Sequence, residues 1–230
     1  FFKQKTAYEI YQCDWSSDVC SSDLAGQLTL YRFLEKNGFK EPEKEFRIIS
    51  QIRDDRVAAL STGDVHGAIE TPFGLEARGV AKRLAEIYDD PFINRPGTLW
   101  VGEAFEQKYP DVVQRIVNRV VKNAHWSSQE ANRETQYQLW TRSGVNTYID
   151  NKRTWDRTKD LRTRHNPLLD EYYTASIQRS IDEIKGYRLT RRDVSLEGWL
   201  EPKYLNNALR ELKLETYWPT QDANGKFIRT

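Results

Sequence analysis

The spacing of hydrophobic positions changes along the chain and divides it into two parts. In the first part, short runs of β-branched and aromatic residues alternate with stretches whose apolar residues recur at helical spacing. The runs predict strands at residues 46–52, 65–69, 83–88 and 98–101. The helical stretches are residues 28–38, 56–60 and 74–80. Strands that alternate with helices are typical of βα units, so this part predicts an α/β fold with a largely parallel sheet.

After Pro110 the pattern becomes helical. A run of branched apolar residues follows the 3.6-residue period of a helix. These residues are Val112, Val113, Ile116, Val117, Val120 and Val121. Further helices are predicted over residues 129–141, 166–184 and 202–212. Gly38, Gly63 and Gly186 stand where three predicted helices end, a position at which glycine is favoured. The chain is therefore expected to be an α/β unit followed by a helical portion.

The first 24 residues show neither period and contain both cysteines, Cys13 and Cys20. They lack the basic start and apolar run of a signal peptide. They also hold too few cysteines for a disulfide module, and no histidine that would support a zinc site. Back-translation of residues 3–10 and 14–24 gives two strings that resemble the constant parts of a sequencing-library adapter. We therefore expect residues 1–24 to be a non-native segment that packs poorly against the rest, and the remainder to be a fragment of a longer protein.

Composition narrows the class of protein. Without this segment, 206 of the 230 residues remain, with 33 basic and 30 acidic side chains. This near balance gives no basic footprint for nucleic acid, and no apolar run approaches the roughly 18 residues of a membrane span. The length allows one large domain or two small lobes. None of the remaining residues is cysteine, so they offer no thiol nucleophile.

Signals for metal binding or catalysis are weak. The three histidines, His66, His125 and His165, are far apart and lack the spacing of metal ligands. No Gly-x-Ser-x-Gly sequence and no Walker-type sequence occurs.

A basic stretch at residues 152–164 surrounds Trp155. The acids Asp156 and Asp160 are interleaved at salt-bridging spacing, which favours a solvated face over a nucleic-acid surface. Three other tryptophans lie in helical patterns and are interpreted as packing residues before ligand contacts. They are Trp126, Trp140 and Trp199.

One turn is placed where ligands bind in open α/β sheets. The predicted strand 65–69 is followed by a turn through Glu70, Thr71 and Pro72 into a helix near Phe73. In such folds ligands lie outside the carboxyl ends of the strands, so these four residues are candidates for lining a cleft. An ordinary connecting turn gives the same pattern, and it is the favoured interpretation of this feature alone.

The same region carries a resemblance to a known family. Residues 60–68 read Leu-Ser-Thr-Gly-Asp-Val-His-Gly-Ala, followed by Pro-Phe at 72–73 and Leu-Ala at 84–85. This order resembles the Ala-Leu-x-x-Gly-x-Val-Asp-Ala, Pro-Phe and Leu-Ala pattern of substrate-binding proteins of nitrate/sulfonate/taurine ABC importers. It departs from that pattern at His66, where the family usually has aspartate, and at Glu70 and Thr71, near which the family has Trp-Glu or Ser-Pro.

The resemblance continues through the helical portion and covers nearly all of residues 25–230. The later motifs are Gly-Glu-Ala-Phe at 102–105, Tyr-Pro-Asp-Val-Val at 109–113, Pro-Leu-Leu at 167–169, Asp-Val-Ser at 193–195 and Tyr-Leu-Asn-Asn-Ala-Leu at 204–209. It implies a periplasmic-binding-protein-like (type II) clamshell, truncated, with a helical C-terminal portion. Residues 25–103 would form the second lobe, and residues 104–230 a helical return to the first lobe, whose N-terminal part would be missing.

The implied function is solute binding. A protein of this family is the extracytoplasmic solute-binding component of an ABC importer. It captures a small organic anion, such as an aliphatic sulfonate or a taurine-like compound, and delivers it to a permease in the membrane. The resemblance implies a monomer, periplasmic or extracellular and membrane-anchored, with no enzymatic step, no cofactor, no metal and no nucleic-acid partner.

The resemblance also implies where the anion binds. In this family the helix that corresponds to residues 26–37 points its N-terminus into the cleft. Free main-chain N–H groups and the helix dipole at such an end bind a sulfonate or carboxylate without a basic side chain. Ala25, Gly26 and Gln27 are small or polar, as a close main-chain approach requires. With residues 70–73 they form the predicted ligand-binding set, and a plain helix start at Gly26 is an equally favoured alternative.

Two other functions stay open. An enzyme on the same fold, desulfinase-like or thiamine-pyrimidine-synthase-like, would require a cysteine nucleophile or a site rich in cysteine and histidine, which residues 25–230 lack. A helical interaction module built on residues 110–212 would be favoured by a long basic groove, against which the interleaved acids argue.

Overall fold

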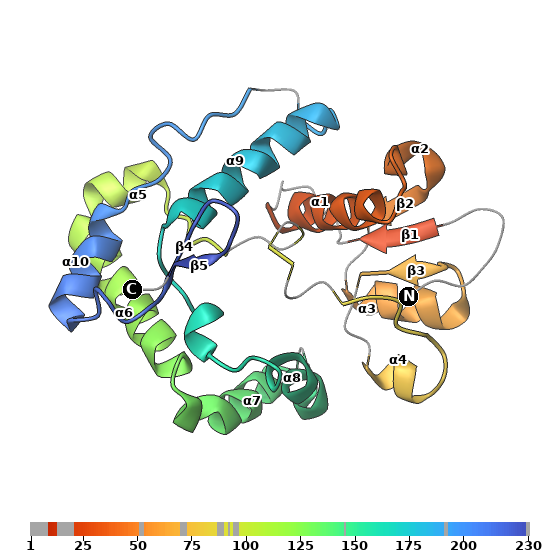
Figure 1. The fold of residues 1–230 in the computed structure, drawn as a ribbon, viewed down its shortest axis with the longest axis horizontal. Helices are drawn as coiled ribbons and strands as arrows, with labels where there is room; N and C mark the ends of the chain where they lie inside the picture. Colours follow the sequence, from red (N-terminus) through yellow and green to blue (C-terminus); the bar gives the residue numbers. More distant parts are fainter. Residues whose placement is uncertain are drawn as a thin grey trace. The chain divides into compact units, whose positions relative to one another are not determined.

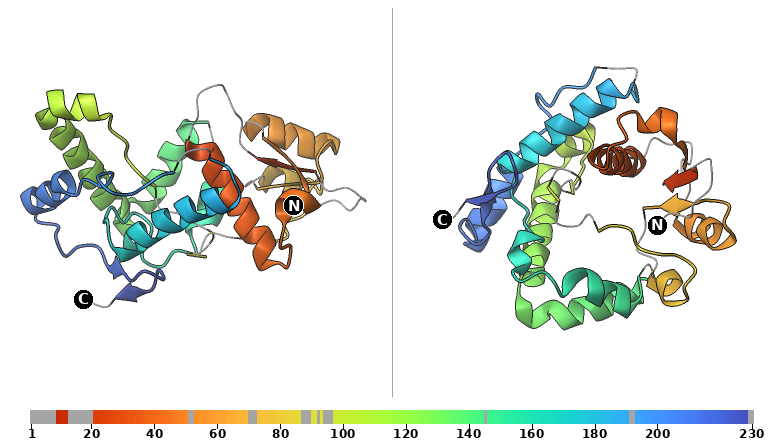
Figure 2. Two further views of the ribbon diagram at one scale, coloured as in Figure 1. Left: turned by 90° about the horizontal axis from the view of Figure 1, so that it is seen from above. Right: turned by 45° about the vertical axis from the view of Figure 1, so that its right-hand side comes forward.

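The structure of the chain, a computed structural model, describes residues 9–12, 21–50, 53–69, 73–86, 90–91, 93, 97–144, 146–190 and 193–228. Its contacts divide the chain into two compact units (Figure 1, Figure 2). The first comprises Phe1–Arg95 and Arg179–Asp193, and the second comprises Pro96–Gln178 and Val194–Thr230. Helix α9, Glu171–Gly186, therefore begins in the second unit and ends in the first.

A three-stranded parallel sheet lies in the first unit (Figure 1). Its strand order is β2-β1-β3, and Ile10 of the central strand lies opposite Ile48 on one side and Gly67 on the other. The strands are β1 Glu9–Gln12, β2 Arg47–Ser50 and β3 Gly67–Ala68. The helices are α1 Ser21–Lys36, α2 Pro42–Glu45, α3 Arg53–Thr62 and α4 Phe73–Ala77. The predicted alternation of strands and helices with parallel pairing is confirmed in this unit.

The central strand comes from the segment for which the sequence predicts poor packing. Ile10 and Tyr11 are strand-favouring residue types, and β1 pairs along its whole length with β2. Residues 21–24 form the first turn of α1, where serine and aspartate favour a helix start. The prediction that residues 1–24 pack poorly against the rest is wrong for these two stretches, because their local preferences allow one to form a strand between β2 and β3 and the other to begin a helix. The origin of the segment is not tested by main-chain pairing and stays a prediction, and Cys13 and Cys20 lie outside the described residues.

Two apolar clusters hold the first unit together. In one, Leu30 and Leu34 of α1 pack with Phe46. The other joins α3, β3 and α4 through Ala59, Leu60, Val65, Ala68 and Leu75. Gly38 and Gly63 follow α1 and α3 with φ of 95° and 82°, a left-handed conformation that glycine adopts without a Cβ clash. Both predicted helix ends are therefore confirmed.

The second unit is mainly helical. Val121 of helix α6 packs with Ala208 and Leu209 of helix α10 and with Trp218, which confirms part of the predicted apolar stripe on residues 112–121. Its helices, besides the start of α9, are α5 Glu103–Lys108, α6 Pro110–Ser127, α7 Arg133–Arg142, α8 Tyr148–Trp155 and α10 Lys203–Leu212. Two short 3-10 turns, Glu130–Asn132 and Leu161–Thr163, and a hairpin of β4 Thr220–Gln221 and β5 Phe227–Ile228 complete it. Within the residues that the structure describes, no helix combines the length and the apolar character needed to cross a membrane.

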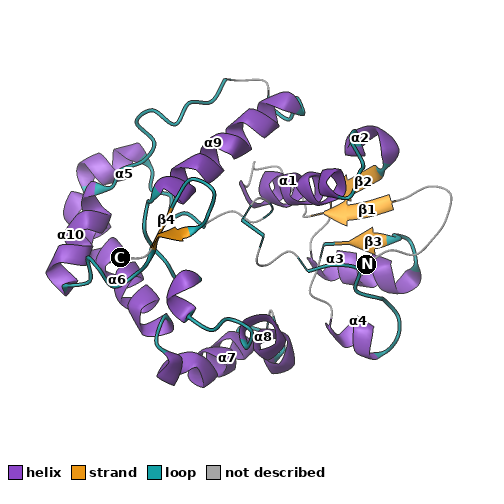
Figure 3. Cartoon of the chain, viewed as in Figure 1, coloured by secondary structure: helices purple, strands orange, loops and turns teal. Residues whose placement is uncertain are grey.

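Two predicted strands do not form where the chain is described. Residues 83–86 and 97–102 have no regular secondary structure, and Figure 3 draws the connection between α4 and α5 without a strand. Strand preference reflects packing beside a neighbouring strand, and no described residue pairs with either stretch.

Helix α9 begins later than predicted because polar side chains hold the residues before it in turns. The Asn166 side-chain oxygen accepts the N–H of Leu168 at 2.9 Å, and the Asp170 carboxylate accepts the N–H of Tyr173 at 3.0 Å. Both are local bonds that compete with a helix and favour its start instead. The sequence patterns predicted neither α5 nor α8 nor the hairpin.

Candidate functional site

The carboxyl edge of the first-unit sheet is the candidate site. Because β1, β2 and β3 are parallel, Gln12, Ser50 and Ala68 end their strands at the same edge. Each strand is followed by a helix, so α1, α3 and α4 all begin after that edge (Figure 1). The first-turn N–H groups of a helix lack partners within the helix and carry its partial positive charge. Such an edge favours a small anion.

The structure places the first predicted ligand-binding residues inside a helix. Because α1 begins at Ser21, Ala25, Gly26 and Gln27 lie in its second turn. Main-chain N–H groups in a second turn are bonded within the helix, so the N–H groups of α1 that lack a partner within the helix belong to its first turn. The predicted helix start at Gly26 is therefore wrong, whereas the contact of these residues with a ligand stays a prediction.

The Gln27 side chain has a partner of its own. Its amide nitrogen donates to the Tyr31 hydroxyl at 2.8 Å, one helical turn further on. The amide oxygen belongs to the same half-buried side chain, at the end of α1 nearer to the candidate edge. Gln27 is therefore the predicted site residue at which the substitution of a charged side chain best tests the site.

The second set of predicted residues lies in the connection between β3 and α4. Glu70, Thr71 and Pro72 fall outside the described residues. Phe73 is the first residue of α4 and is half-buried. The predicted strand before this connection and the predicted helix after it are confirmed, whereas the turn itself lies outside the described residues.

Helix α1 is fixed within the first unit by a buried arginine. The Arg32 side chain is 7% exposed and donates from Nε and Nη2 to the Glu183 carboxylate at 2.8 and 2.5 Å. It also donates to the Ser180 hydroxyl at 3.0 Å and to the carbonyl of Ile93 at 3.4 Å. A guanidinium engaged on this many sides is committed to internal partners, so Arg32 is not a candidate for binding an incoming anion.

Aromatic packing supports the same contact between α1 and the end of α9. The Tyr31 ring meets the Tyr187 ring edge-on, with centroids 4.6 Å apart, and the Tyr187 hydroxyl donates to Glu35. Sequence reasoning missed this set. Arg32 and Glu183 are 151 residues apart, and a single sequence carries no signal that would pair them.

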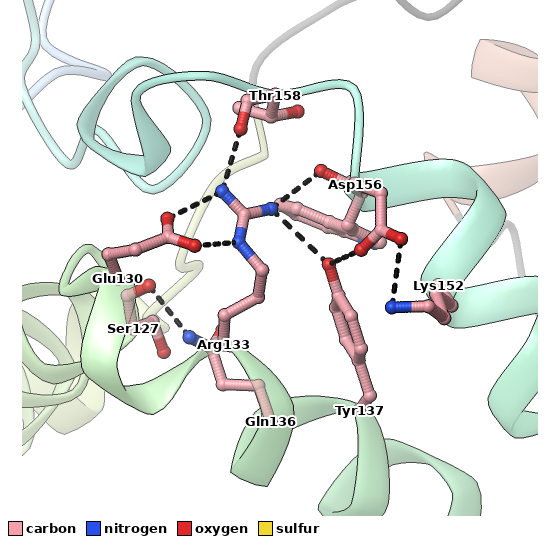
Figure 4. Close-up of polar contacts among 9 residues, drawn as sticks. Ser127, Glu130, Arg133, Gln136, Tyr137, Lys152, Asp156 and Thr158 are labelled. Atoms are coloured by element: carbon pink, nitrogen blue, oxygen red, sulfur yellow. Dashed lines mark hydrogen bonds and ion pairs between the residues drawn. The ribbon is translucent and has the colours of Figure 1, made fainter.

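A second polar cluster, around Arg133, lies in the second unit (Figure 4). Arg133 donates to both oxygens of Glu130 at 2.6 and 2.7 Å, and to the carbonyls of Trp155 and Thr158 at 2.7 Å each. It also reaches the Tyr137 hydroxyl at 3.3 Å. Its hydrogen bond with Glu130 is the main reason that the pKa of the Arg133 guanidinium is raised. All five N–H directions of the fork are occupied, so this cluster ties α7 to the end of α8 and leaves no donor for a ligand.

A neutral imidazole lies beside this cluster. The His165 ring stacks on Trp155 with centroids 4.9 Å apart and planes 7° from parallel. Its Nε2 is buried and has no hydrogen-bond partner in the described part of the chain. Burial, followed by the charges of Arg164 and Arg133, lowers the pKa of His165 to about 4. Among the described residues no carboxylate is hydrogen-bonded to the ring, so the partner that commonly orients a general base is not found there.

Metal chemistry has no support in the part of the chain that is described. No group of three or more histidine, cysteine, aspartate or glutamate side chains there is placed to hold a metal ion. His125 meets the Tyr217 ring edge-on, while His165 stacks on Trp155, so these two imidazoles are packing residues in separate aromatic groups.

Comparison with known proteins supports the fold. No family model matches the chain, and no curated protein matches it. Among solved structures, the chain is similar to a protein from Methylobacillus flagellatus KT that is described as the periplasmic sulfonate-binding protein SsuA of a sulfonate ABC transporter. The two superpose with a TM-score of 0.72 at 24% sequence identity. The match covers 94% of this chain and 63% of that protein. The chain therefore has a periplasmic-binding-protein-like fold and spans less than two thirds of the length of the structure it matches.

Proposed function

We propose that this chain belongs to the solute-binding component of an ABC importer and binds a small organic anion, such as an aliphatic sulfonate or a taurine-like compound. The observation that carries the proposal is the fold that the chain shares with a protein described as sulfonate-binding. The parallel sheet agrees with it, because three helices begin after one sheet edge and create an environment for an anion. The partners are the anion and a membrane permease, and the protein works as a monomer in the periplasm or outside the cell.

We assign the anion to the start of α1 and to the turn before α4. A sulfonate presents three acceptor oxygens, which match several main-chain N–H groups at one helix end. The N–H groups of residues 21–24 are part of the main chain, so they are present whichever side chains the native protein has there. Ala25, Gly26 and Gln27 then border the anion in the second turn, and residues 70–73 approach it from the neighbouring connection.

We also assign the chain to the two lobes of a clamshell. Residues 25–103 form most of one lobe of a clamshell, and residues 104–230 return towards the other lobe. The 63% coverage of the matched protein supports this, because that structure contains a substantial part with no counterpart in this chain. Closure of two lobes on a ligand is a hinge motion that a permease can sense.

An enzyme on the same fold is the alternative, and no specific observation favours it. A desulfinase-like reaction would need an activated thiolate. Both cysteines, Cys13 and Cys20, lie in the segment that resembles an adapter and outside the described residues. Turnover of a sulfinate by the purified chain would nevertheless replace the binding proposal.

The proposal is tested by calorimetric titration of the chain with ethanesulfonate and taurine, using two charge variants of α1. Gln27→Glu places a carboxylate near the positive end of the helix. Asn37→Asp makes the same amide-to-acid change just after its other end. Repulsion between the carboxylate introduced by Gln27→Glu and a nearby sulfonate costs about 1.4 kcal/mol at intermediate dielectric, so the dissociation constant is expected to rise about tenfold. The Asn37→Asp control is expected to change it less than about twofold, because the added charge lies a helix length away.

The outcomes of this titration separate the site from the function. If both variants bind as the parent chain does, the anion lies elsewhere. If the parent chain binds neither compound, the assignment to sulfonate transport is wrong.

A further inference from the structure

One face of helix α6 carries a row of exposed basic side chains. Arg115, Arg119 and Lys122 follow one another at spacings of four and three residues, so they lie on the same face of the helix. In the described part of the chain none of the three makes a side-chain hydrogen bond or an ion pair. They differ in this from Arg133 and Arg162 of the same unit, which are both ion-paired. These three residues are called the α6 basic row below.

The acids near the α6 basic row do not neutralise it. Asp111 is the single acid of α6 and lies one turn before Arg115. Glu211 of the neighbouring helix α10 accepts a hydrogen bond from Asn118 at 2.6 Å. Among the described residues neither acid is ion-paired with the row. The formal net charge of the whole chain is only +1, so the positive charge at α6 is a local feature of the surface.

Exposed aliphatic side chains run beside the α6 basic row. Ile116 and Val120 directly follow Arg115 and Arg119 in the sequence, and they are 40% and 42% exposed. They also lie one turn apart, so they form a second row parallel to the first. The side of α6 that packs in the core is a different one, since Val121 contacts α10 and Trp218. The exposed side of the helix is therefore basic along one row and aliphatic along the next.

This combination matches the surface of an anionic bilayer. Basic side chains are attracted to anionic head groups, and aliphatic side chains beside them gain by entering the boundary between head groups and acyl chains. A nucleic acid would satisfy the cations alone and leave Ile116 and Val120 in water. The row from Arg115 to Lys122 is only about 10 Å long, so the contact is small and its binding is reversible.

We infer that α6 is a docking face for an anionic lipid surface, with the α6 basic row on the head groups and Ile116 and Val120 at the acyl boundary. The contact is peripheral and lies within the second unit. It brings the chain to a membrane without requiring a membrane-bound protein partner. The inference does not depend on which ligand the chain binds or on the assignment to sulfonate transport.

The test is sedimentation of the full chain with phospholipid vesicles. Vesicles of phosphatidylcholine with about 30% phosphatidylglycerol are expected to bind the chain at least about tenfold more tightly than vesicles of phosphatidylcholine alone. Raising the salt from about 0.05 M to about 0.5 M is expected to remove most of this difference, because it shortens the range of the electrostatic attraction. No sulfonate is added, so failure of this test is distinct from failure to bind ligand.

A triple variant tests the α6 basic row. Arg115→Gln, Arg119→Gln and Lys122→Gln together are expected to lower binding to the anionic vesicles at least about tenfold, because each basic side chain near such a surface contributes about fivefold. A control variant removes the same number of exposed cations elsewhere in the second unit and is expected to change binding less than about twofold. Its substitutions are Arg142→Gln, Lys159→Gln and Lys226→Gln.

A double variant tests the aliphatic row. Ile116→Ser with Val120→Ser leaves every charge in place and removes the apolar side chains. It is expected to weaken binding about fivefold or more at both salt concentrations, because the gain from burying apolar surface is not screened by salt.

Four outcomes overturn the inference. Equal binding to the two kinds of vesicle excludes a role for anionic lipid. Equal losses in the basic-row variant and its control place the contact elsewhere than α6. A serine variant that binds as the parent chain does excludes insertion at the acyl boundary. Binding of soluble poly-aspartate by the parent chain, lost in the basic-row variant while vesicles bind neither, identifies an acidic polypeptide as the occupant.

Discussion

Replacement of Arg133 by methionine is expected to lower the free energy of unfolding of the second unit by about 3–5 kcal/mol. The Arg133 side chain is 14% exposed and is the common donor for Glu130, Tyr137 and two backbone carbonyls. Methionine keeps much of the apolar stem but removes every donor, so the carbonyls of Trp155 and Thr158 lose their charged partner. Glu130, which is 70% exposed, can turn to water, and the cost therefore falls mainly on the carbonyls.

Two further variants make the measurement specific. Arg133→Lys keeps the charge but loses the planar fork, so it is expected to recover part of the stability and not all of it. Arg142→Met removes an exposed arginine from the same helix α7 and is expected to cost less than about 0.5 kcal/mol. Urea unfolding followed by tryptophan emission reports the change, because Trp155 adjoins the cluster. A cost below about 1 kcal/mol for Arg133→Met would show that water replaces the guanidinium at both carbonyls.

The long periodic helices could be predicted from the sequence because their signal is local. The apolar spacing after Pro110 places α6, and the same stripe provides Val121 to the core with α10. Helix α8 was missed because its residues are mostly charged or polar. The readable signal was the capping box in which the Thr147 side chain and Asp150 bond each other's main chain. The salt-bridging spacing predicted there is confirmed, since Lys152 pairs with Asp156 at 3.0 Å.

Strands were harder to predict because strand stability is non-local. Residues 98–101 have strand-forming side chains but no described neighbour to pair with. Strand β1, in contrast, lies in a segment with little apolar content and yet pairs with two neighbouring strands. Trp199 illustrates the same limit for packing. Its sequence context indicates a packing residue, yet it is 58% exposed, because burial depends on a partner that the pattern does not name.

The candidate site also combines features that could be predicted from the sequence with features that could not. The turn from β3 towards α4 follows from a strand pattern and a Thr-Pro pair, both readable from the sequence. The start of α1 does not, because serine and aspartate at residues 21–23 extend the helix beyond the apolar period that defined it. The anchoring of α1 by Arg32 depends on Glu183, 151 residues away, and only the folded chain brings the two together.

The second large effect is expected from pH. The second unit should lose stability as pH falls from about 6.5 to about 4, because His165 is neutral in the folded state. Its pKa is lowered to about 4 by burial and by Arg164 and Arg133, whereas an unfolded histidine titrates near 6.5. Between these values the unfolded chain binds the proton and the folded chain does not, so each step down in pH favours unfolding. The stability that the neutral ring provides is complete above about pH 6.5.

The size of the effect follows from the two pKa values. A difference of about 2.5 units corresponds to about 3 kcal/mol, and partial exposure of the ring reduces this to about 2 kcal/mol. Carboxylates also titrate near the lower end of this range. Glu130 and Asp160 have pKa values lowered chiefly by hydrogen bonds from Arg133 and Arg162, and their contribution is lost only as pH falls further. A difference between two variants is therefore needed to isolate the imidazole.

His165→Phe supplies that difference, because phenylalanine retains an aromatic ring beside Trp155 and cannot be protonated. Between pH 7 and pH 4.5 the free energy of unfolding of the parent chain is expected to fall by about 2 kcal/mol more than that of the variant. Arg164→Met removes the cation that lies 4.2 Å from the Trp155 ring centroid. It is expected to raise the pKa of His165 and so to narrow the pH range over which the parent chain loses stability. Proton NMR of the imidazole measures that pKa directly. Parallel pH profiles for the parent chain and His165→Phe would mean that the ring is hydrated in the folded state, since water at Nε2 is what would let it accept a proton at its ordinary pKa.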